Sequence, residues 1–278
     1  MSAAAKVGVA PRAAVASAAA GAAASELFQA WPAIARRLRA ARRIALVLDF
    51  DGTLVPIAPR PEDVVLEDST RQVLQRLARH RRIYLAFLSG RRRADLIRRL
   101  QVKGAHYFGL YGWERDGRFR VRQTEKKVLE ALRTELEEKV SALPGVRVED
   151  KEFSVATHYR GAKADVVRRL RKIMEEEGAR AGADFHTTET QCVIELLTHR
   201  VRDKGEAMTR LLATLQKPVL PIYVGNDEVD EGAFAALGSN GISVHVGEFA
   251  ATCAKYRVAS PRETTEFLLK IEEVISGA

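Results

Sequence analysis

The stretch that decides the fold is IALVLDFDGTLVPI, residues 44–57. Its first five residues are all apolar, which is typical of a strand buried on both faces of a parallel sheet. Asp49 and Asp51 follow this strand directly. Because ligands of such sheets bind beyond the carboxyl ends of the strands, the two carboxylates are expected at the functional edge. The stretch therefore predicts an α/β fold with acidic chemistry at that edge.

The spacing of the two aspartates suits phosphate transfer. Two side chains separated by one residue on an extended chain point to the same side, and Gly52 lets the backbone turn away from them. Asp49 can then attack phosphorus, while Asp51 protonates the leaving oxygen and later deprotonates water. Since crowded carboxylates repel each other, the pair predicts a divalent cation, and Mg²⁺ is the usual choice beside phosphate. The alternative is a strand-to-loop turn with acidic capping residues.

A second apolar run, residues 83–88 (IYLAFL), ends at Ser89, Gly90 and Arg91. A hydroxyl, a flexible backbone and a guanidinium are groups that suit a phosphate oxygen. Taken alone, Ser89 could equally be the N-cap of a helix.

A third apolar run, residues 219–224 (VLPIYV), ends in GNDEVDE, which places Asn226, Asp227 and Asp230 at another strand end as candidate metal ligands. Upstream, Lys204 opens the segment KGEAMTRLLATL, whose apolar residues recur at helical spacing. A cation there can neutralise a phosphoryl oxygen and the nucleophile. The alternatives are a solvated lysine and capping acids.

With these motifs in order, the chain resembles the haloacid dehalogenase superfamily of phosphatases, and within it the trehalose-6-phosphate phosphatases, over most of residues 44–260. The resemblance implies a Rossmann-like parallel-sheet core with an inserted α/β cap domain, and Mg²⁺ as cofactor. It makes Asp49 the nucleophile, Asp51 the general acid and base, and Ser89 and Lys204 the phosphate holders. The implied metal ligands are Asp49, Asp51, Asn226 and Asp227.

The narrower resemblance rests on GLYGWE at 109–114, which is similar to the family's GxxGxE element, and on VEDKEFSVATHYR at 148–160, which is similar to its cap segment. The glutamate of VIELL matches the family's cap glutamate. The substrate-binding residues implied are Gly90, Arg91, Glu114, Lys151, His158, Arg160 and Glu195.

Two segments depart from the family pattern. GNDEVDE stands where the family normally shows GDDxTDE, so Asn226 supplies no negative charge and the ion is expected to bind more weakly or to rely on Asp227. In THRVRDKG, residues 198–205, the family's Arg-Pro pair is missing, and Arg200 and Arg202 are the candidates to replace it.

The chain divides by its patterns into three parts. Residues 1–25, dominated by alanine, are predicted to be a disordered tail, with a signal or transit peptide as the alternative. Residues 26–116 and 199–278 are predicted to form the core, opening with an amphipathic helix capped by Ser25. Residues 117–198 read as βαββαββ, with helices at 125–142 and 163–178, which predicts a small antiparallel sheet acting as a lid. The alternative is a second domain with an unrelated binding function.

Composition narrows the class of protein further. The formal net charge is +9, yet no aromatic-interleaved surface accompanies the basic clusters, so a phosphorylated small molecule is a better partner than nucleic acid. The absence of an apolar run of about 18 residues argues against a membrane span. The chain has 2 cysteines, far apart in sequence, which favours a cytoplasmic protein, and we expect a monomer.

Together these observations predict a Mg²⁺-dependent phosphatase that converts trehalose 6-phosphate to trehalose. The alternatives are a phosphatase of another glycosyl phosphate, such as a glucosyl- or mannosyl-glycerate phosphate, and a catalytically weakened sugar-phosphate sensor.

Overall fold

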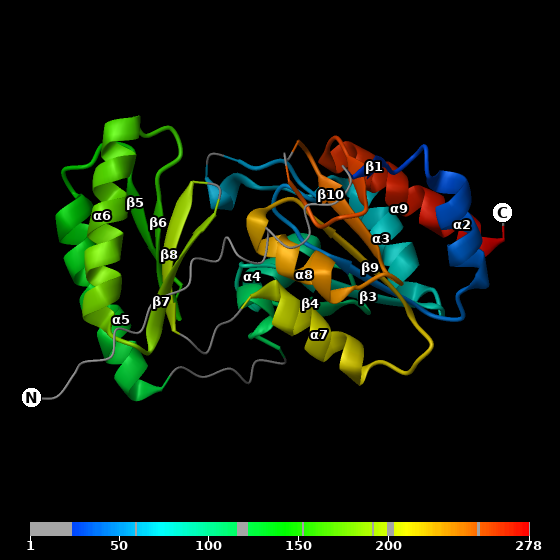
Figure 1. Cartoon of the computed structure of the whole chain (residues 1–278), viewed down its shortest axis with the longest axis horizontal. Coiled ribbons are helices and arrows are strands. Elements are labelled where there is room, and N and C mark those ends of the chain that lie inside the picture. Colours follow the sequence, from blue (N-terminus) through cyan, green and yellow to red (C-terminus); the bar gives the residue numbers. More distant parts are fainter. Residues whose placement is uncertain are drawn as a thin grey trace, which may run out of the picture.

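The computed structural model describes residues 24–58, 60–115, 122–151, 153–190, 192–198, 203–248 and 251–277. These residues form two separate sheets, one parallel and one antiparallel, which lie in the two lobes of the molecule (Figure 1). The predicted α/β fold with a parallel core and a second, smaller sheet is confirmed. The alanine-rich tail, apart from its last two residues, lies outside the described residues.

The larger sheet has seven parallel strands in the order β1-β11-β10-β9-β2-β3-β4. The apolar run after residue 43 forms β2, buried along its whole length between β9 and β3. The strands are β1 (Ser25–Glu26), β2 (Ile44–Leu48), β3 (Ile83–Leu88), β4 (His106–Phe108), β9 (Leu220–Gly225), β10 (Ile242–Val246) and β11 (Tyr256–Val258).

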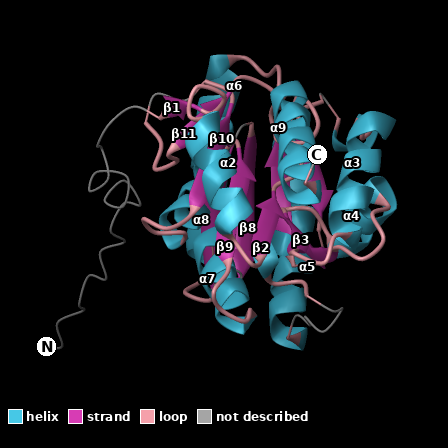
Figure 2. Cartoon of the chain, turned by 90° about the vertical axis from the view of Figure 1, so that its right-hand side faces the viewer, coloured by secondary structure: helices cyan, strands magenta, loops and turns pink. Residues whose placement is uncertain are grey.

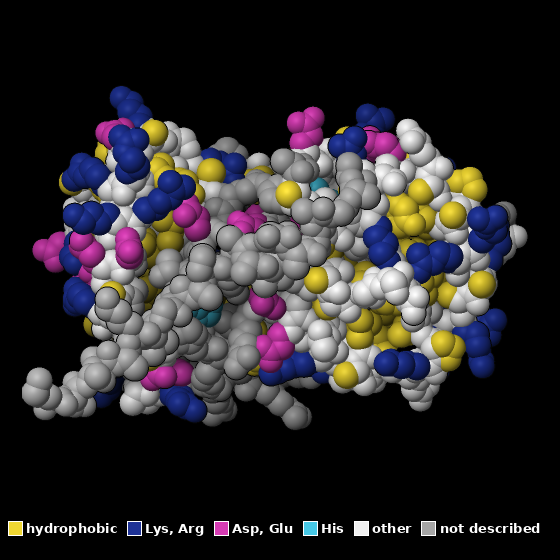
Figure 3. Space-filling model, viewed as in Figure 1, with side chains coloured by type: hydrophobic (Ala, Val, Ile, Leu, Met, Phe, Trp, Pro, Cys, Tyr) yellow, Lys and Arg dark blue, Asp and Glu magenta, His cyan; other side chains and the backbone are white. Residues whose placement is uncertain are grey.

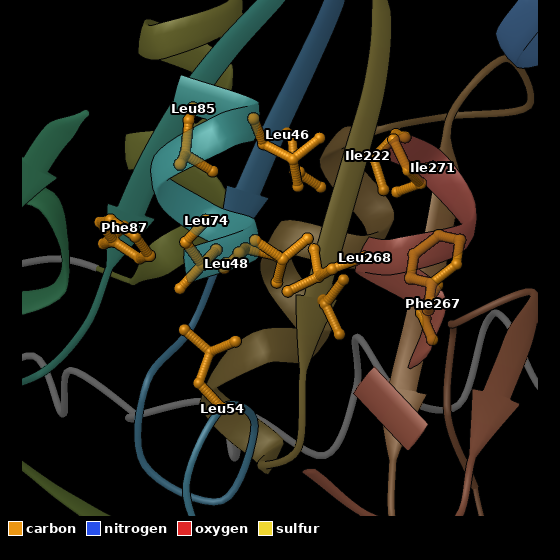
Figure 4. Close-up of a cluster of buried hydrophobic side chains, with 14 of the residues drawn as sticks. Leu46, Leu48, Leu54, Leu74, Leu85, Phe87, Ile222, Phe267, Leu268 and Ile271 are labelled. Atoms are coloured by element: carbon orange, nitrogen blue, oxygen red, sulfur yellow. The ribbon is translucent and has the colours of Figure 1, made fainter. Parts of the chain in front are cut away.

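Helices cover both faces of this sheet (Figure 2). Successive residues of a strand point to opposite faces. Leu46 and Leu48 pack under one group of helices, and Figure 4 shows this cluster around Phe267 and Leu268, whereas Val47 faces α7 and α8. The helices are α2 (Trp31–Ala40), α3 (Asp68–Arg79), α4 (Arg93–Leu100), α7 (Lys204–Thr214), α8 (Glu231–Ala236) and α9 (Pro261–Ser276), with short 3₁₀ turns η1 (Pro61–Asp63), η2 (Leu110–Gly112) and η3 (Glu228–Asp230).

The smaller sheet has four antiparallel strands in the order β5-β6-β8-β7. Two helices pack on it around an apolar cluster that includes Leu136, Leu170 and Leu196. Its elements are α5 (Gln123–Val140), β5 (Arg147–Asp150), β6 (Ser154–His158), α6 (Ala164–Ala181), β7 (Phe185–Thr190) and β8 (Val193–Thr198). The described pattern is therefore αββαββ, and the extra leading strand of the prediction would fall in a stretch outside the described residues. The predicted domain boundaries also fall beside such stretches and stay a prediction.

The beginning of the core differs from the prediction. Ser25 does not cap a helix. It lies in β1, where it pairs with Tyr256 of β11, and the helix begins only at Trp31. Pro32 explains the late start, because its ring and missing N–H are tolerated in the first turn of a helix but not deeper inside it.

The charged side chains are spread over the surface. Figure 3 shows Lys and Arg side chains on both lobes of the visible face, interspersed with acidic ones. No helix within the described ranges is both long and apolar enough to cross a membrane.

Candidate active site

The carboxyl ends of three adjacent strands bring the predicted residues to one edge. Leu48 of β2 pairs with Phe87 of β3 and with Val224 of β9. The residues that follow these strands therefore emerge side by side. The main chain of Asp49 extends the ladder by one bond, because its N–H donates to the carbonyl of Val224 at 2.9 Å.

Asp49 lies in a buried ion cluster with Lys204 and Asp230. The Lys204 ammonium donates to Asp49 Oδ1 at 2.7 Å and to Asp230 Oδ1 at 2.6 Å. Burial raises the pKa of the Asp49 carboxyl to about 7, against the opposing attraction of Lys204. Burial alone would lower the pKa of Lys204, but the two carboxylates raise it above its ordinary value. Lys204 therefore stays charged and holds one oxygen of Asp49 in place.

Asp230 holds this cluster to the strand end. Its Oδ1 also accepts from the Tyr223 hydroxyl at 2.6 Å, and its Oδ2 accepts from the main-chain N–H groups of Asn226 and Asp227, both at 2.9 Å. A fully buried carboxylate with this many donors is satisfied as an anion. Asp230 thus fixes both the lysine and the turn that carries Asn226.

The side-chain amide of Asn226 faces three oxygens, and its two orientations give different chemistry. With the NH₂ group inward, it donates to Thr53 Oγ1 at 3.1 Å, to Asp49 Oδ2 at 3.2 Å and to the main-chain oxygen of Asp51 at 2.7 Å. With its oxygen inward, it accepts from Thr53 Oγ1 and meets the other two oxygens with no proton between them. Such convergence of oxygens is what a cation requires.

The donor set fits Mg²⁺. Neighbouring ligands of an octahedral Mg²⁺ with bonds of 2.0–2.1 Å lie about 2.9 Å apart, close to the spacing of these oxygens. The described residues contain no group of three His, Cys, Asp or Glu side chains suited to a metal, so the candidate site combines a carboxylate, an amide and a main-chain carbonyl. Gly52 leaves room for it, since a Cβ there would lie 2.2 Å from the Asn226 amide nitrogen.

The carboxylate of Asp51 is held by Arg91. The guanidinium donates to both of its oxygens, from Nε at 2.6 Å and from a terminal nitrogen at 2.7 Å. The other terminal nitrogen of Arg91 donates to Asp95 at 2.8 Å. Asp51 is therefore positioned by a planar two-bond contact, which fixes its orientation as well as its charge.

A cavity of about 700 Å³ opens above these groups, between the two sheets. Its floor includes Asp49, Ser89 and Lys204, and its opposite wall comes from the antiparallel sheet. Eleven of the sequence-predicted site residues line it: Asp49, Asp51, Ser89, Gly90, Arg91, Lys151, His158, Arg160, Lys204, Asn226 and Asp227.

Comparison with known proteins assigns this arrangement to a family. The family model for trehalose-phosphatase matches residues 47–262. The chain belongs to the trehalose-phosphatase family. It is 34% identical over 248 residues to the trehalose-phosphate phosphatase of Mycobacterium marinum, a match that covers 84% of this chain and 63% of that protein. The chain thus spans less than two thirds of that relative's length.

Solved structures show the same fold. The C-terminal domain of the Candida albicans trehalose-6-phosphate phosphatase superposes with a TM-score of 0.76 at 22% identity, covering 92% of this chain and 99% of that one. A haloacid dehalogenase-like hydrolase from Bacteroides thetaiotaomicron gives a TM-score of 0.58 at 17% identity, with coverages of 82% and 99%. Trehalose-phosphatase family membership and the haloacid dehalogenase-like fold are therefore both confirmed.

Two of the predicted substrate-binding residues of this trehalose-phosphatase family member do not line the cavity. Glu114 accepts from the main-chain N–H of Arg93 at 2.6 Å, at the start of α4. Glu195 is 1% exposed and accepts from the Tyr111 hydroxyl at 2.7 Å. Both carboxylates already have protein partners, so their contact with a substrate stays a prediction. Arg200 and Arg202 lie outside the described residues.

The geometry separates the two candidate metal residues at the third strand end. Asp227 accepts from the N–H of Glu228 at 2.7 Å and caps η3. Asn226 instead faces the Asp49 carboxylate and the Asp51 carbonyl. Asn226 is therefore the better placed ligand, and Asp51 would contribute its main-chain oxygen rather than its carboxylate.

Sequence reasoning did not place Tyr111 or Asp95 among the site residues, and it gave Asp230 only as a candidate metal ligand, not as the partner that anchors Lys204. Asp230 had a signal, because an acid three residues after Asp227 is the pattern of a capping box. Tyr111 had none, since its partner Glu195 lies in a distant segment. Asp95 did have one, because its three arginine partners lie three or four positions away along the chain, a spacing at which opposite charges meet on a helix.

Asp95 supports the site through arginines, and its removal should lower stability. It accepts from Arg91 and Arg99, each at 2.8 Å, and from Arg98. Burial acts to raise its pKa, but these three guanidinium groups overcome that effect and lower the pKa to about 2. Because the folded-state pKa lies below the unfolded one, the stabilisation is present above pH 4 and is lost as pH falls toward 2.

We expect Asp95→Asn to lower the free energy of unfolding by about 1–2 kcal/mol at pH 7, after allowing for partial exposure. Urea unfolding of both proteins between pH 7 and pH 3 checks this, and the difference should shrink toward pH 3. A difference that is the same at both ends would show that the charge of Asp95 is not its cause.

Proposed function

We propose that this chain is a Mg²⁺-dependent phosphatase that hydrolyses trehalose 6-phosphate to trehalose and phosphate through an aspartyl phosphate. The observation that carries the proposal is the Asp49 carboxylate on the cavity floor, with one oxygen on Lys204 and the other facing Asn226. The names of the relatives support the same substrate. Cytoplasmic location and the monomeric state stay predictions.

In the first half-reaction, an oxygen of Asp49 attacks phosphorus while the bond from phosphorus to the sugar oxygen breaks. Asp51 gives its proton to that leaving oxygen, so the sugar departs as an alcohol. In the second half-reaction, Asp51 takes a proton from water, the water oxygen attacks phosphorus, and the bond to Asp49 breaks to release phosphate.

The surrounding residues stabilise charge during both steps. Lys204 and Ser89 are placed to hold phosphoryl oxygens at the cavity floor. When bound, Mg²⁺ would neutralise negative charge on the phosphate and the nucleophile, held by Asp49, Asn226 and the carbonyl of Asp51.

Arg91 links substrate arrival to proton transfer. It occupies both oxygens of Asp51 in this structure, so Asp51 can exchange a proton with substrate only when that pair loosens. An incoming phosphate offers the guanidinium another anion in the same cavity, which Arg91 also lines. Phosphate binding would therefore free the acid where it is needed.

The cavity suits a phosphate that carries a large polar group. Its volume of about 700 Å³ lies well within the range of small-molecule sites. On the side of the antiparallel sheet it presents donors from Lys151, His158 and Arg160. These can bind sugar hydroxyls while the phosphate lies at the floor, which would make remote sugar contacts the source of specificity.

Phosphate release tests the proposal. Trehalose 6-phosphate, glucose 6-phosphate and an aryl phosphate are compared with Mg²⁺ and with excess chelator. We expect a metal-dependent preference for the disaccharide. Metal-dependent activity on the aryl phosphate alone would reject trehalose 6-phosphate in favour of another glycosyl phosphate. No activity on any substrate would reject the phosphatase and favour a sensor.

The Asn226→Asp variant tests the metal site. The new carboxylate would lie next to that of Asp49, and their repulsion should destabilise the metal-free protein. Its negative charge should also strengthen cation binding. We expect the Mg²⁺ concentration at half-maximal activity to fall about tenfold, an effect of roughly 1.4 kcal/mol.

Thermal unfolding with and without Mg²⁺ gives a readout besides activity. The melting temperature of Asn226→Asp should be below wild type without metal and should rise more steeply with Mg²⁺. Asn240→Asp, on the exposed surface, makes the same change of net charge away from the site and serves as the control. An unchanged response to Mg²⁺ would remove Asn226 from the ligand set.

A further inference from the structure

The turn that carries Tyr111 has an unusual backbone. Leu110 and Tyr111 are consecutive non-glycine residues in the left-handed region, with φ of 49° and 58°. Side chains rarely adopt this conformation unless the surrounding structure holds it. Here the N–H of Leu110 donates to the carbonyl of Arg91, and that of Tyr111 to the carbonyl of Ser89, both at 2.9 Å. The turn is thus fastened to the loop at the catalytic edge.

The strained turn directs the tyrosine ring under that loop. A Cβ at Gly90 would lie 3.0 Å from the ring, so ring and loop are in close contact. The hydroxyl continues past the loop to Glu195 of β8, to which it donates at 2.7 Å. The ring also packs with Leu197 of the same strand. Tyr111 therefore joins the parallel sheet to the antiparallel one by a polar and an apolar contact.

Glu195 extends this chain of contacts to the cavity wall. Its other oxygen accepts from the Ser154 hydroxyl and lies 3.2 Å from the Lys151 ammonium. Lys151 lines the cavity opposite the catalytic floor. A continuous chain of contacts thus runs from the Ser89–Arg91 loop through Tyr111 and Glu195 to Lys151.

We propose that Tyr111 is a positioning residue that ties β8 to the catalytic edge, and that preference for glycosyl phosphates over small phosphates depends on its hydroxyl. This rests on the proposed function. The hydroxyl orients Glu195, which in turn orients Lys151 against the sugar. A small phosphate, which stays at the floor, does not use this wall of the cavity.

The Tyr111→Phe variant removes only the hydroxyl. Because a buried hydrogen bond to a charged group is lost, we expect kcat/KM for trehalose 6-phosphate to fall about 10- to 100-fold. For an aryl phosphate, kcat and KM should stay within about twofold of wild type, since the floor is unchanged. Tyr107→Phe is the matched control, because among the described residues that hydroxyl bonds to the main chain of Val102 and to nothing at the site. It should leave both substrates unaffected.

The Ser154→Ala variant is a second control. Like Tyr111→Phe, it removes a hydroxyl that donates to Glu195, but Ser154 and Glu195 lie in the same sheet, so no contact between the two sheets is lost. Equal effects of Ser154→Ala and Tyr111→Phe on both substrates would overturn the proposal and leave Tyr111 as one holder of Glu195 among others. An equal loss with the aryl phosphate would also overturn it, by showing that the floor itself depends on the hydroxyl.

Amide hydrogen exchange separates failure of this proposal from failure of the proposed function. Residues 193–198 should exchange faster in Tyr111→Phe than in wild type or Tyr107→Phe, whether or not the protein hydrolyses any substrate. Inactivity of wild type on every phosphate would reject the proposed function alone. Unchanged exchange in β8 would reject the tie between the two sheets.

Discussion

Replacing Asp49 by asparagine is expected to abolish turnover while leaving the fold intact. The amide is a poor nucleophile and cannot form the aspartyl phosphate, so kcat should fall on the order of 10⁴-fold or more. The change is nearly isosteric at a buried position, and Lys204 retains its second carboxylate, Asp230. The measurement is phosphate release under saturating Mg²⁺ and substrate, together with thermal unfolding of both proteins.

The stability of Asp49→Asn should equal or exceed that of wild type. Burial disfavours the Asp49 carboxylate, as its raised pKa shows, and the variant removes that buried charge. A second measurement uses substrate labelled in its phosphate group and stops the reaction with acid. Wild-type enzyme should then carry covalently bound label, and the variant should carry none. A variant that keeps more than about one hundredth of the wild-type rate would exclude Asp49 as the nucleophile, since covalent catalysis cannot survive that replacement.

The edge of the parallel sheet that carries the site could be predicted from the sequence, because the patterns that identify its strands are local. Five apolar residues before Asp49 and six before Ser89 identify β2 and β3, and parallel strands that are neighbours end at one edge. The same rule brought Asn226 to that edge. Short-range patterns of this kind also identified the helices and strand pairs of the antiparallel sheet, since turn residues separate them.

Contacts between distant segments could not be predicted in this way. The bonds of Arg91 to Asp51 and of Tyr111 to Glu195 join residues 40 and 84 positions apart, and nothing in the local pattern selects those partners. The left-handed turn at Leu110 was hidden for a related reason. Its conformation is imposed by the loop it packs on rather than by its own residue types, which disfavour it.

Replacing Lys204 by methionine is expected to destabilise the protein and abolish activity together. Methionine keeps much of the volume but removes the only cation that contacts both Asp49 and Asp230 among the described residues. Two buried carboxylates would then face each other without a counter-ion. Loss of one partner from a buried ion cluster typically lowers the free energy of unfolding by about 3–5 kcal/mol. Urea unfolding measures this, and phosphate release should fall by about 10³-fold.

Second substitutions decide which carboxylate causes the loss. Asp230 keeps three other donors after Lys204 is removed, from Tyr223 and from two main-chain N–H groups. Asp49 keeps only longer contacts to its Oδ2, from the Thr53 hydroxyl at 3.3 Å and, with the amide turned inward, from Asn226 at 3.2 Å, and its Oδ1 loses the Lys204 bond. Adding Asp49→Asn to Lys204→Met should therefore restore most of the lost stability, whereas adding Asp230→Asn should restore little. If both additions restore the free energy of unfolding equally, the two carboxylates contribute equally to the loss. If neither restores it, the loss comes from the packing of the lysine side chain. In every case phosphate release should stay at least about 10³-fold below wild type, because each variant lacks the ammonium group that holds Asp49 and offsets its buried charge.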